Sequence, residues 1–420
     1  MQTLQLIIIA VLYILVSGID YWLEYLNYTH LMKYGAEIPP DFEGSIDHEL
    51  LLKTRNYTVE NIKFGAVSSL YDEIILLVFI FGGVLSIFNT WMLSFKLPFI
   101  LCGIVFFLFL TYAKTLLEIP FSLYSAFKIE NKYGFNNMTF KVWIADFMKG
   151  IILSSILLAL LLGGAFWIIQ TLPNIWWLPV WFFFFIFSVF MIYVSPYVIE
   201  PLFNKFTPLD DGEFENDIRE LMGRAGIQIK SVFKMDASKR TKHTNAYFSG
   251  IGKGKRIVLY DTLLEKLDRA EILSVLAHEA GHWKKKHILK HLAILEIASL
   301  AGAYIAFLLL KSDYLSVLFG LQHDSFFARL VLLSLIASIA TWPFSPLLNI
   351  ISRHFEREAD DFACKLTGSG NSLASALVKL SKDNLSNLHP HPLYWKIHYS
   401  HPPAVIRIKK LKSYKNVISA

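Results

Sequence analysis

Seven apolar stretches, each close to the length of a membrane-spanning helix, dominate this sequence of 420 residues. About 20 apolar residues in helical conformation are needed to cross the hydrocarbon core of a bilayer. Only 18% of the residues are charged, against roughly 25% in ordinary soluble domains. The sequence therefore predicts a mainly α-helical, polytopic membrane protein with spans at about 4–23, 74–95, 97–117, 150–170, 176–196, 288–310 and 328–350.

The spacing of these spans divides the chain into two regions. Residues 1–196 contain five spans and form the predicted N-terminal membrane domain. Residues 197–420 form the predicted second domain. This second region consists of a polar segment, the last two spans and a polar C-terminal tail, so its chemistry-bearing residues lie largely outside the bilayer.

The basic residues predict the orientation of the chain. With seven spans the connections alternate between two sides, and nearly all of the 40 Lys and Arg residues lie on the side of the polar segment and the tail. The other side and its flanks hold only Lys96, Lys311 and Arg329. Because positively charged loops stay in the cytoplasm, we expect the N-terminus outside and the C-terminus in the cytoplasm. The net charge of +6 reflects these lipid-facing loops, so we expect no nucleic-acid partner.

The polar segment predicts a small sheet with helices. An amphipathic helix follows a Pro/Asp/Gly turn and stops at Gly226, and "VFKMD" predicts a strand. In "TNAYFSGIGKGKRIVLYD", residues 244–261, aromatic and β-branched residues flank a Gly/Lys turn, which predicts a β-hairpin. A phosphate-binding loop is an alternative for these glycines, but no helix begins at Gly254 to provide an N-terminus for phosphate.

The strongest chemical pattern is "HEAGH", residues 278–282, in a helical stretch whose N-cap is Asp261 or Asp268. His278 and His282 are four residues apart and therefore project from one helix face. In this arrangement the two imidazoles hold Zn²⁺, and Glu279 is the base that takes a proton from the attacking water. An isolated pair of this kind would more simply be two surface histidines, but this chain also offers a third ligand.

The third ligand is expected from "SRHFEREADDFA", residues 352–363. A catalytic zinc takes three protein ligands and keeps one position open, and we assign Glu356 as the missing ligand. At 100° per residue, Glu356, Ala359 and Asp360 share one helix face. The small Ala359 would let the two helices approach closely, and Asp360 would accept the free ring N–H of a ligand histidine. An ordinary surface role for Asp360 is the alternative.

Three further polar residues follow this motif on the same predicted helix. His287 and His291 form a second i, i+4 pair, but a continuous helix would place them about 180° and 220° from His278, on its far face. We see no acid partner for them and interpret them as polar groups at the membrane boundary. Glu296 would return to the face of His278 about 27 Å along the helix. A carboxylate at that depth faces water or protein, which predicts a hydrated cavity within the membrane.

Several spaced motifs resemble those of the CAAX prenyl endopeptidases, integral-membrane zinc proteases of the gluzincin type. They lie between about residues 194 and 410 and read "PLFNKFTPL", "NAYFSG", "KRIVLYDTLL", "HEAGHW", "SRHFEREADDFA" and "HYSHPP". The resemblance implies seven transmembrane helices around a water-filled chamber, with one zinc ion at its cytoplasmic end. It also implies that residues 197–420 form the metalloprotease domain and supports the zinc ligands and the general base assigned above.

The same resemblance implies roles for residues outside the two metal-binding motifs. It places Asn245 at the catalytic site, on an edge strand that binds the substrate backbone and includes Ala246, Tyr247 and Phe248. It gives His401 the role of stabilising the oxyanion and Arg407 that of orienting the third ligand. These roles are chemically consistent, because an exposed strand can hold an extended peptide and proteolysis needs a donor at the developing oxyanion.

The sequence therefore predicts an integral-membrane zinc metalloendopeptidase that cleaves near the C-terminus of CAAX-type substrates, with a prenylated peptide or protein and membrane lipid as its partners. A quality-control protease with broad, unprenylated substrates is the alternative with the same chemistry. A metal transporter would need paired acids and broken helices near the midplane, and few are present. An inactive zinc scaffold would have no use for Glu279.

Two features outside the motifs bear on the host membrane. The outside connection 311–327 is short, and the C-terminal "YKNVISA" carries no dilysine retrieval signal. Both favour a bacterial inner membrane over an endoplasmic reticulum. In a host without prenylated proteins, the substrates would be other membrane proteins or peptides.

Overall fold

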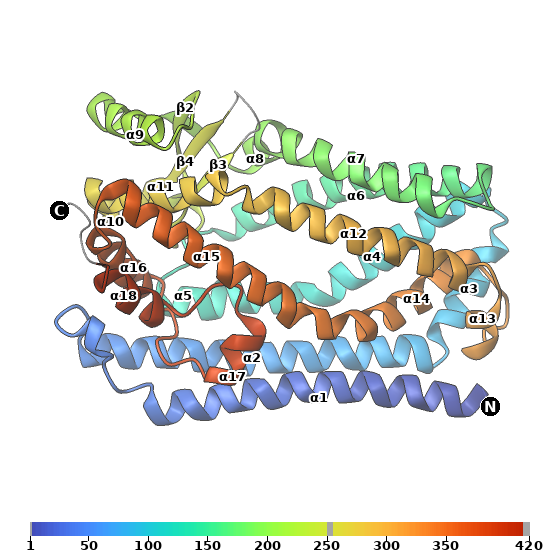
Figure 1. Cartoon of the computed structure of the whole chain (residues 1–420). Helices are drawn as coiled ribbons and strands as arrows, with labels where there is room; N and C mark the ends of the chain where they lie inside the picture. The colour runs from blue at the N-terminus through green and yellow to red at the C-terminus, as the bar shows by residue number, and fades with distance from the viewer. Residues whose placement is uncertain (1, 250–254, 415–420) are drawn as a thin grey trace.

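The structure is a computed structural model that describes residues 2–249 and 255–414. It is an elongated bundle of long helices with a small sheet at one end, and the N-terminus lies at the other end (Figure 1). As the sequence predicts, seven described helical segments are long and apolar enough to cross a membrane: Thr3–Tyr34, His48–Phe81, Phe99–Tyr133, Phe140–Thr171, Trp177–Phe203, His287–Leu310 and Phe326–Thr367.

The second span differs from its predicted bounds. Helix α2 (His48–Phe81) begins far earlier than position 74, runs beside α1 (Gln2–Tyr34) and ends before Gly82 (Figure 1). Gly83 has a φ of 80°, which glycine adopts without strain, and a separate short helix α3 (Val84–Ser94) follows it. The apolar run 74–95 is therefore the end of one helix, a glycine turn and a second helix.

The remaining helices of the membrane domain are continuous over longer stretches. The chain passes through α4 (Phe99–Tyr124), a π-helix (Ser125–Glu130) and the short α5 (Asn131–Tyr133). It continues through α6 (Phe140–Thr171), α7 (Trp177–Val194), a second π-helix (Ser195–Ile199) and α8 (Glu200–Phe203). Figure 1 shows that α7 leads to the end of the bundle where the sheet lies.

The sheet has four strands in the order β1-β2-β4-β3. Strands β3 (Ala246–Ser249) and β4 (Arg256–Tyr260) pair antiparallel as the predicted hairpin, whose turn at 250–254 lies outside the described residues. Strand β2 (Ser231–Met235) pairs parallel with β4 and antiparallel with β1 (Phe206–Pro208). Strand β3 is therefore at an edge of the sheet, with its second side free of strand pairing within the described residues.

Side-chain caps fix the helices around the sheet. Asp211 accepts a hydrogen bond from Phe214 N at 3.0 Å and starts α9 (Gly212–Arg224). The short α10 (Asp261–Lys266) follows β4. Asp268, one of the two predicted N-caps, then starts α11 (Arg269–Lys284) in a capping box with Glu271.

The helix that carries HEAGH ends earlier than expected. Lys286 has a φ of 57°, which stops α11, and α12 (His287–Leu310) starts at the next residue in a new direction. Positive φ is uncommon for a residue with a side chain, and glycine or asparagine usually marks such a position. A lysine stands here, so the sequence does not reveal the bend. The predicted span 288–310 is confirmed as α12, but the prediction that the helix of HEAGH continues into it without a break is wrong.

The chain then returns to the sheet end. After α13 (Tyr314–Leu318), α14 (Phe326–Thr341) and a 3₁₀ turn (Trp342–Phe344), helix α15 (Ser345–Thr367) runs back beside α11. The described chain finishes with α16 (Asn371–Asp383), α17 (Pro392–His398) and α18 (Ala404–Lys412).

One apolar core holds this end of the molecule together. Leu276 and Ala277 of α11 pack in the same buried cluster as Ile257 and Leu259 of β4 and Met222 of α9, and all five are fully buried. Close packing of this kind leaves little freedom for α11 to rotate. The core therefore fixes which helix face presents His278 and His282.

Candidate metal centre

Helices α11 and α15 approach each other at two small residues. Ala359 is fully buried. A Cβ atom added to Gly281 would lie 2.9 Å from the Cα atom of Ala359, too close for any real contact. The sequence predicted the small side chain of Ala359 as the contact point but did not single out Gly281. This close approach brings the carboxylate of Glu356, on α15, to His278 and His282 of α11.

The three predicted ligands meet at this crossing. The Nε2 atoms of His278 and His282 are 3.2 Å apart. Glu356 Oε1 lies 3.1 Å from His282 Nε2, and Glu356 Oε2 lies 3.5 Å from His278 Nε2. Within residues 2–249 and 255–414, these three side chains are the one group of His, Cys, Asp and Glu residues close enough to share a metal ion.

The donor set fits a zinc ion in size and in charge. Ligand atoms about 2.0–2.1 Å from a tetrahedral zinc are about 3.3–3.4 Å apart, close to the 3.1–3.5 Å separations found here. Glu356 Oε2 is buried without a hydrogen bond, although Arg407 Nη1 lies 3.3 Å away. A buried carboxylate oxygen in this state needs an explanation, and a bound cation supplies one.

Asp360 and Arg407 surround the first histidine. Asp360 Oδ1 lies 2.8 Å from His278 Nδ1. Arg407, from α18, donates to both carboxylate oxygens of Asp360 at 2.6 and 3.0 Å. Burial and Arg407 lower the pKa of His278, but hydrogen bonds with Asp360 and Glu356 outweigh them and raise it to about 9. At 2.8 Å, Asp360 Oδ1 can accept the N–H of His278 Nδ1, so that Nε2, which faces the other donors, is the nitrogen left for a metal.

Three more assigned residues line a cavity of about 380 Å³ beside these ligands: Glu279, His401 and Asn245. Glu279 lies on α11, and Asn245 directly precedes β3. His401, in the loop before α18, is 63% exposed and places Nε2 3.2 Å from Glu356 Oε1. Its Nδ1 is 2.9 Å from Ser400 Oγ, which orients the ring.

The predicted edge-strand residues divide between two cavities. Ala246 lines the same cavity as Glu279. Tyr247 and Phe248 line a neighbouring cavity of about 690 Å³ between α7, α12 and the sheet, which also reaches His282. The Tyr247 hydroxyl donates to Glu200 at 2.8 Å. The free edge of β3 therefore runs past the metal ligands with one apolar cavity adjoining it.

The prediction that His287 lies on the far face of the helix is wrong. Because the backbone bends at Lys286, His287 lies against the metal ligands instead of on a far face, with Nδ1 3.1 Å from His282 Nδ1. It also has the acid partner that seemed to be missing, since Nε2 lies 3.0 Å from Glu358 Oε2. The only available signal was a histidine five residues after a predicted ligand, which a regular helix would turn away.

The bend also removes the argument that linked Glu296 to the metal-binding face. Glu296 lies on α12, where its backbone oxygen accepts from Trp181 Nε1 of α7 at 3.2 Å. Its carboxylate lies 3.4 Å from Ser299 Oγ. Glu296 thus belongs to the contact between α7 and α12, and a hydrated cavity at this depth stays a prediction.

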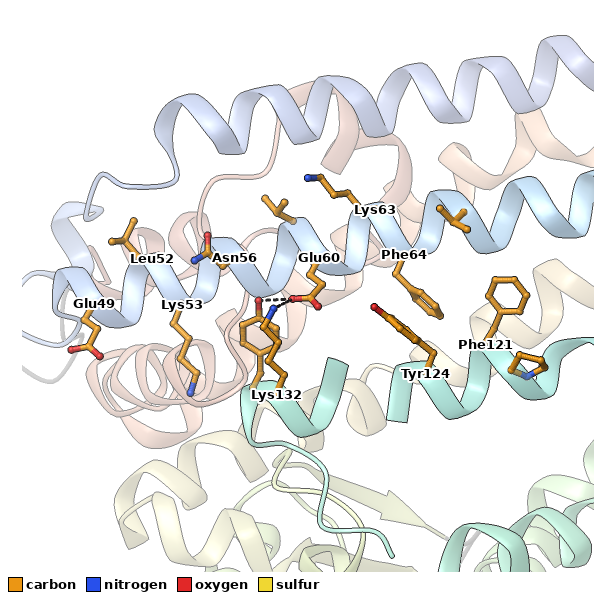
Figure 2. Close-up of a pocket in the computed structure, with 14 residues that line it drawn as sticks. Glu49, Leu52, Lys53, Asn56, Glu60, Lys63, Phe64, Phe121, Tyr124 and Lys132 are labelled. Atoms are coloured by element: carbon orange, nitrogen blue, oxygen red, sulfur yellow. Dashed lines mark hydrogen bonds and ion pairs between the residues drawn. The ribbon is translucent and has the colours of Figure 1, made fainter. Parts of the chain in front are cut away.

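A larger cavity of about 1110 Å³ lies away from this chemistry, between α2 and the α4–α5 segment (Figure 2). Lys132 Nζ and Tyr133 Oη donate to Glu60 Oε2 at 2.7 and 2.8 Å and tie α5 to α2. Phe64 and Tyr124 stack further along with ring centroids 5.4 Å apart. Cavity size therefore does not locate the reactive residues in this protein.

Family models match almost the whole chain. The CAAX prenyl protease N-terminal model, with five membrane helices, matches residues 27–205. The peptidase family M48 model matches residues 208–415, which include every assigned site residue. The chain belongs to the CAAX prenyl protease family. Its seven spans and small mixed sheet are therefore the family fold, as predicted.

Curated relatives and a solved structure agree with this membership. CAAX prenyl protease 1 homolog of Arabidopsis thaliana is 36% identical over 89% of this chain and 90% of the relative. CAAX prenyl protease 1 of Saccharomyces cerevisiae is 34% identical over 92% of this chain and 91% of the relative. The crystal structure of S. mikatae Ste24p matches with a TM-score of 0.89 at 32% identity, covering 97% of this chain and 99% of that one.

Family membership fixes the broad class of activity. The chain is a membrane metalloprotease of the CAAX prenyl protease family, as the sequence predicts, and this assignment is favoured over a general quality-control protease. The sequence resemblance rested on motifs in the C-terminal half, whereas the comparisons extend through the membrane helices.

Proposed function

We propose that this family member is a zinc endopeptidase that cleaves near the C-terminus of CAAX-type substrates and holds one zinc ion per chain. The observation that carries the proposal is the meeting of His278, His282 and Glu356, with donor separations that suit zinc. Glu279, which is not among these donors, lines the same cavity. An acid in this position is what a hydrolytic site needs and a structural metal site does not.

The residues around the ligands have complementary roles in this proposal. Bound zinc would polarise the scissile carbonyl and make the attacking water more acidic. Glu279 takes the proton from that water and passes it to the leaving amine. His401 reaches to within 3.2 Å of Glu356, so it can donate a hydrogen bond to the oxyanion that develops beside the ligands.

The substrate backbone would be held by the free edge of β3. A peptide that adds to a sheet edge gains backbone hydrogen bonds at alternate residues. Asn245, at the start of this edge, lines the cavity together with Glu279. Its carbonyl accepts from Tyr260 N at 3.1 Å and its side-chain Oδ1 accepts from Ala246 N at 2.9 Å, and these bonds hold the side chain at the cavity where a substrate would lie.

A prenylated substrate suits the apolar cavity that adjoins this edge. The cavity reaches His282 and is lined by apolar residues of α7 and α12, among them Val189, Ile192, Ile288, Leu289 and Leu292. Burying an isoprenoid chain there would contribute about 25 cal/mol per Å² of apolar surface. The proposed partners are therefore a prenylated peptide or protein and the surrounding lipid.

The side of the membrane that holds most of the Lys and Arg residues would be the cytoplasm in this proposal, and the N-terminus would lie outside. Prenylated C-termini are cytoplasmic, so the zinc site would meet its substrate on that side. The short 311–327 connection favours a bacterial inner membrane as the host membrane, and the prenylated substrate proposed here requires a host that makes prenylated proteins or peptides.

Paired peptides test the substrate class. Purified protein in detergent should cleave a fluorogenic farnesylated CAAX peptide and leave its unprenylated twin uncut or cut at least tenfold more slowly. Equal cleavage of both peptides would contradict a prenyl requirement while leaving the protease intact. Zinc content measured on the same sample, with a result near one ion per chain, separates a wrong substrate from an empty metal site.

A further inference from the structure

We infer that His287 and Glu358 are positioning residues, which form a hydrogen-bonded chain that orients His282 toward the metal. This inference rests on the proposed zinc function. The two ligand histidines would then be held by different devices, since His278 is held directly by Asp360 at 2.8 Å. Neither His287 nor Glu358 touches the other metal donors in the described contacts, so both would act through His282.

The backbone bend is what brings His287 into place. Lys286 adopts a φ of 57° between α11 and α12, a backbone conformation that is unfavourable for a residue with a side chain. His287 follows at once and is only 2% exposed. Strain of this kind persists only where the surroundings hold it, and here it turns one imidazole toward another.

The hydrogen bonds run in one direction from ligand to carboxylate. His282 presents Nε2 to the other donors, 3.1 Å from Glu356 Oε1, so its proton belongs on Nδ1 when the metal is bound. That N–H can donate to His287 Nδ1, 3.1 Å away. His287 then carries its proton on Nε2 and donates it to Glu358 Oε2 at 3.0 Å. A single set of tautomers therefore satisfies every ring nitrogen in the chain.

Packing fixes the geometry of this series of hydrogen bonds. The His287 ring stacks on Phe355, with ring centroids 4.2 Å apart and planes within 5° of parallel. Phe355 immediately precedes the ligand Glu356 on α15, and Glu358 follows it by two residues. One helix thus provides the third metal ligand, the stacking partner of His287 and the terminal acceptor, which makes the arrangement dependent on the α11–α15 crossing.

The hydrogen bonds that run from His282 through His287 to Glu358 should slow the loss of zinc. Groups that hydrogen-bond a metal-bound histidine fix its tautomer and orientation, and removing them typically costs 10–100-fold in metal affinity or activity. His287→Phe keeps an aromatic ring to stack on Phe355 but ends the hydrogen bonds. We expect it to release zinc to a chelator at least 10-fold faster than wild type.

The control is a neighbouring histidine in a similar setting. His291 lies edge-on to the same Phe355 ring at 4.9 Å, and His291→Phe should release zinc at the wild-type rate. Glu358→Gln, whose amide oxygen still accepts from His287, should have a smaller effect than Glu358→Ala. Because both positions act through one chain, adding Glu358→Ala to His287→Phe should cause little further change.

Three results decide the inference. Release rates at the wild-type value in both His287→Phe and Glu358→Ala would overturn it, as would equal acceleration by His291→Phe. If His287 and Glu358 only stabilised the fold, the zinc-free variants would melt at a clearly lower temperature than zinc-free wild type. We expect their melting temperatures to stay within a few degrees of wild type. If His287→Phe itself fails to fold, the partly exposed Glu358→Ala decides alone. A wild-type protein without zinc would refute the proposed function instead, because no release could then be measured.

Discussion

The metal centre buries charged side chains of both signs next to one another. The side chains of Glu356 and Asp360 are only 4% and 3% exposed, and Arg407, at 11%, contacts both. With His278 neutral, as a metal ligand is, two buried carboxylates beside one guanidinium leave one unbalanced negative charge, which a divalent cation would more than offset. The carboxylates were predictable from their helical spacing, but Arg407 was assigned from resemblance alone because it lies on a different helix, 47 residues beyond Asp360 in sequence.

A second charged contact at the residue scale should give a pH signal. His243 Nε2 lies 3.3 Å from Glu130 Oε2, and Nδ1 lies 2.9 Å from Asn384 Oδ1. The hydrogen bond with Glu130 raises the pKa of His243, while burial and Lys266 of α10 oppose the change. A raised pKa means that folding favours the protonated ring. The ring also stacks on Phe135.

The His243 contribution should therefore be complete below pH about 6.5, the unfolded value, and disappear as pH rises through the raised pKa. Its size should stay below about 1 kcal/mol because the side chain is 38% exposed and screened by solvent. The measurement is the melting temperature of wild type minus that of His243→Gln, taken from pH 5.5 to 8.5. A difference that grows with pH would contradict the assignment.

At the scale of elements, the crossing of α11 and α15 determines the site. The sequence predicted both helices, since their ligand spacings have helical periodicity, and it predicted the small residue at the contact. It missed the bend after Lys285 because a lysine with positive φ leaves no mark in a sequence. The position of His287 therefore required the structure, although each histidine was visible from the start.

Gly281→Ala tests the crossing. The added Cβ would lie 2.9 Å from Ala359 Cα and 3.1 Å from its carbonyl oxygen, so backbone must move. Overpacking of this kind costs about 1–3 kcal/mol, and we expect a lower melting temperature and a reduced zinc content. Gly223→Ala in α9, where a Cβ has open space, is the matched control and should leave both unchanged or raise stability slightly. Equal behaviour of the two variants would show that the helices are not in close contact.

At the scale of the whole molecule, the bilayer explains what the sequence could predict. Apolar length is set by membrane thickness, so the number of spans was predictable. The bounds of α2 were not, because its 34 residues extend about 51 Å and its polar half continues beyond any hydrocarbon core of about 30 Å. Hydropathy identifies the part of a helix inside lipid and says little about the part outside it.

Orientation in the membrane is a testable property of the whole chain. Cys102 and Cys364 are buried, so a new exposed cysteine can report which side it faces. In sealed right-side-out vesicles, an impermeant maleimide should label Ser312→Cys, between α12 and α13. It should label Ser413→Cys, after α18, only when the vesicles are opened. The reverse pattern would place the metal site outside the cytoplasm.

The most direct test of the central claim separates metal binding from catalysis. Zinc content and cleavage of the farnesylated peptide should be measured together for wild type, Glu279→Gln and Glu356→Ala. We predict that Glu279→Gln holds about one zinc per chain and loses at least 100-fold in turnover, since general acid–base groups contribute 10²–10⁴-fold, while Glu356→Ala loses both zinc and turnover. A zinc-loaded Glu279→Gln that cleaves at the wild-type rate would contradict the proposed role of this helix.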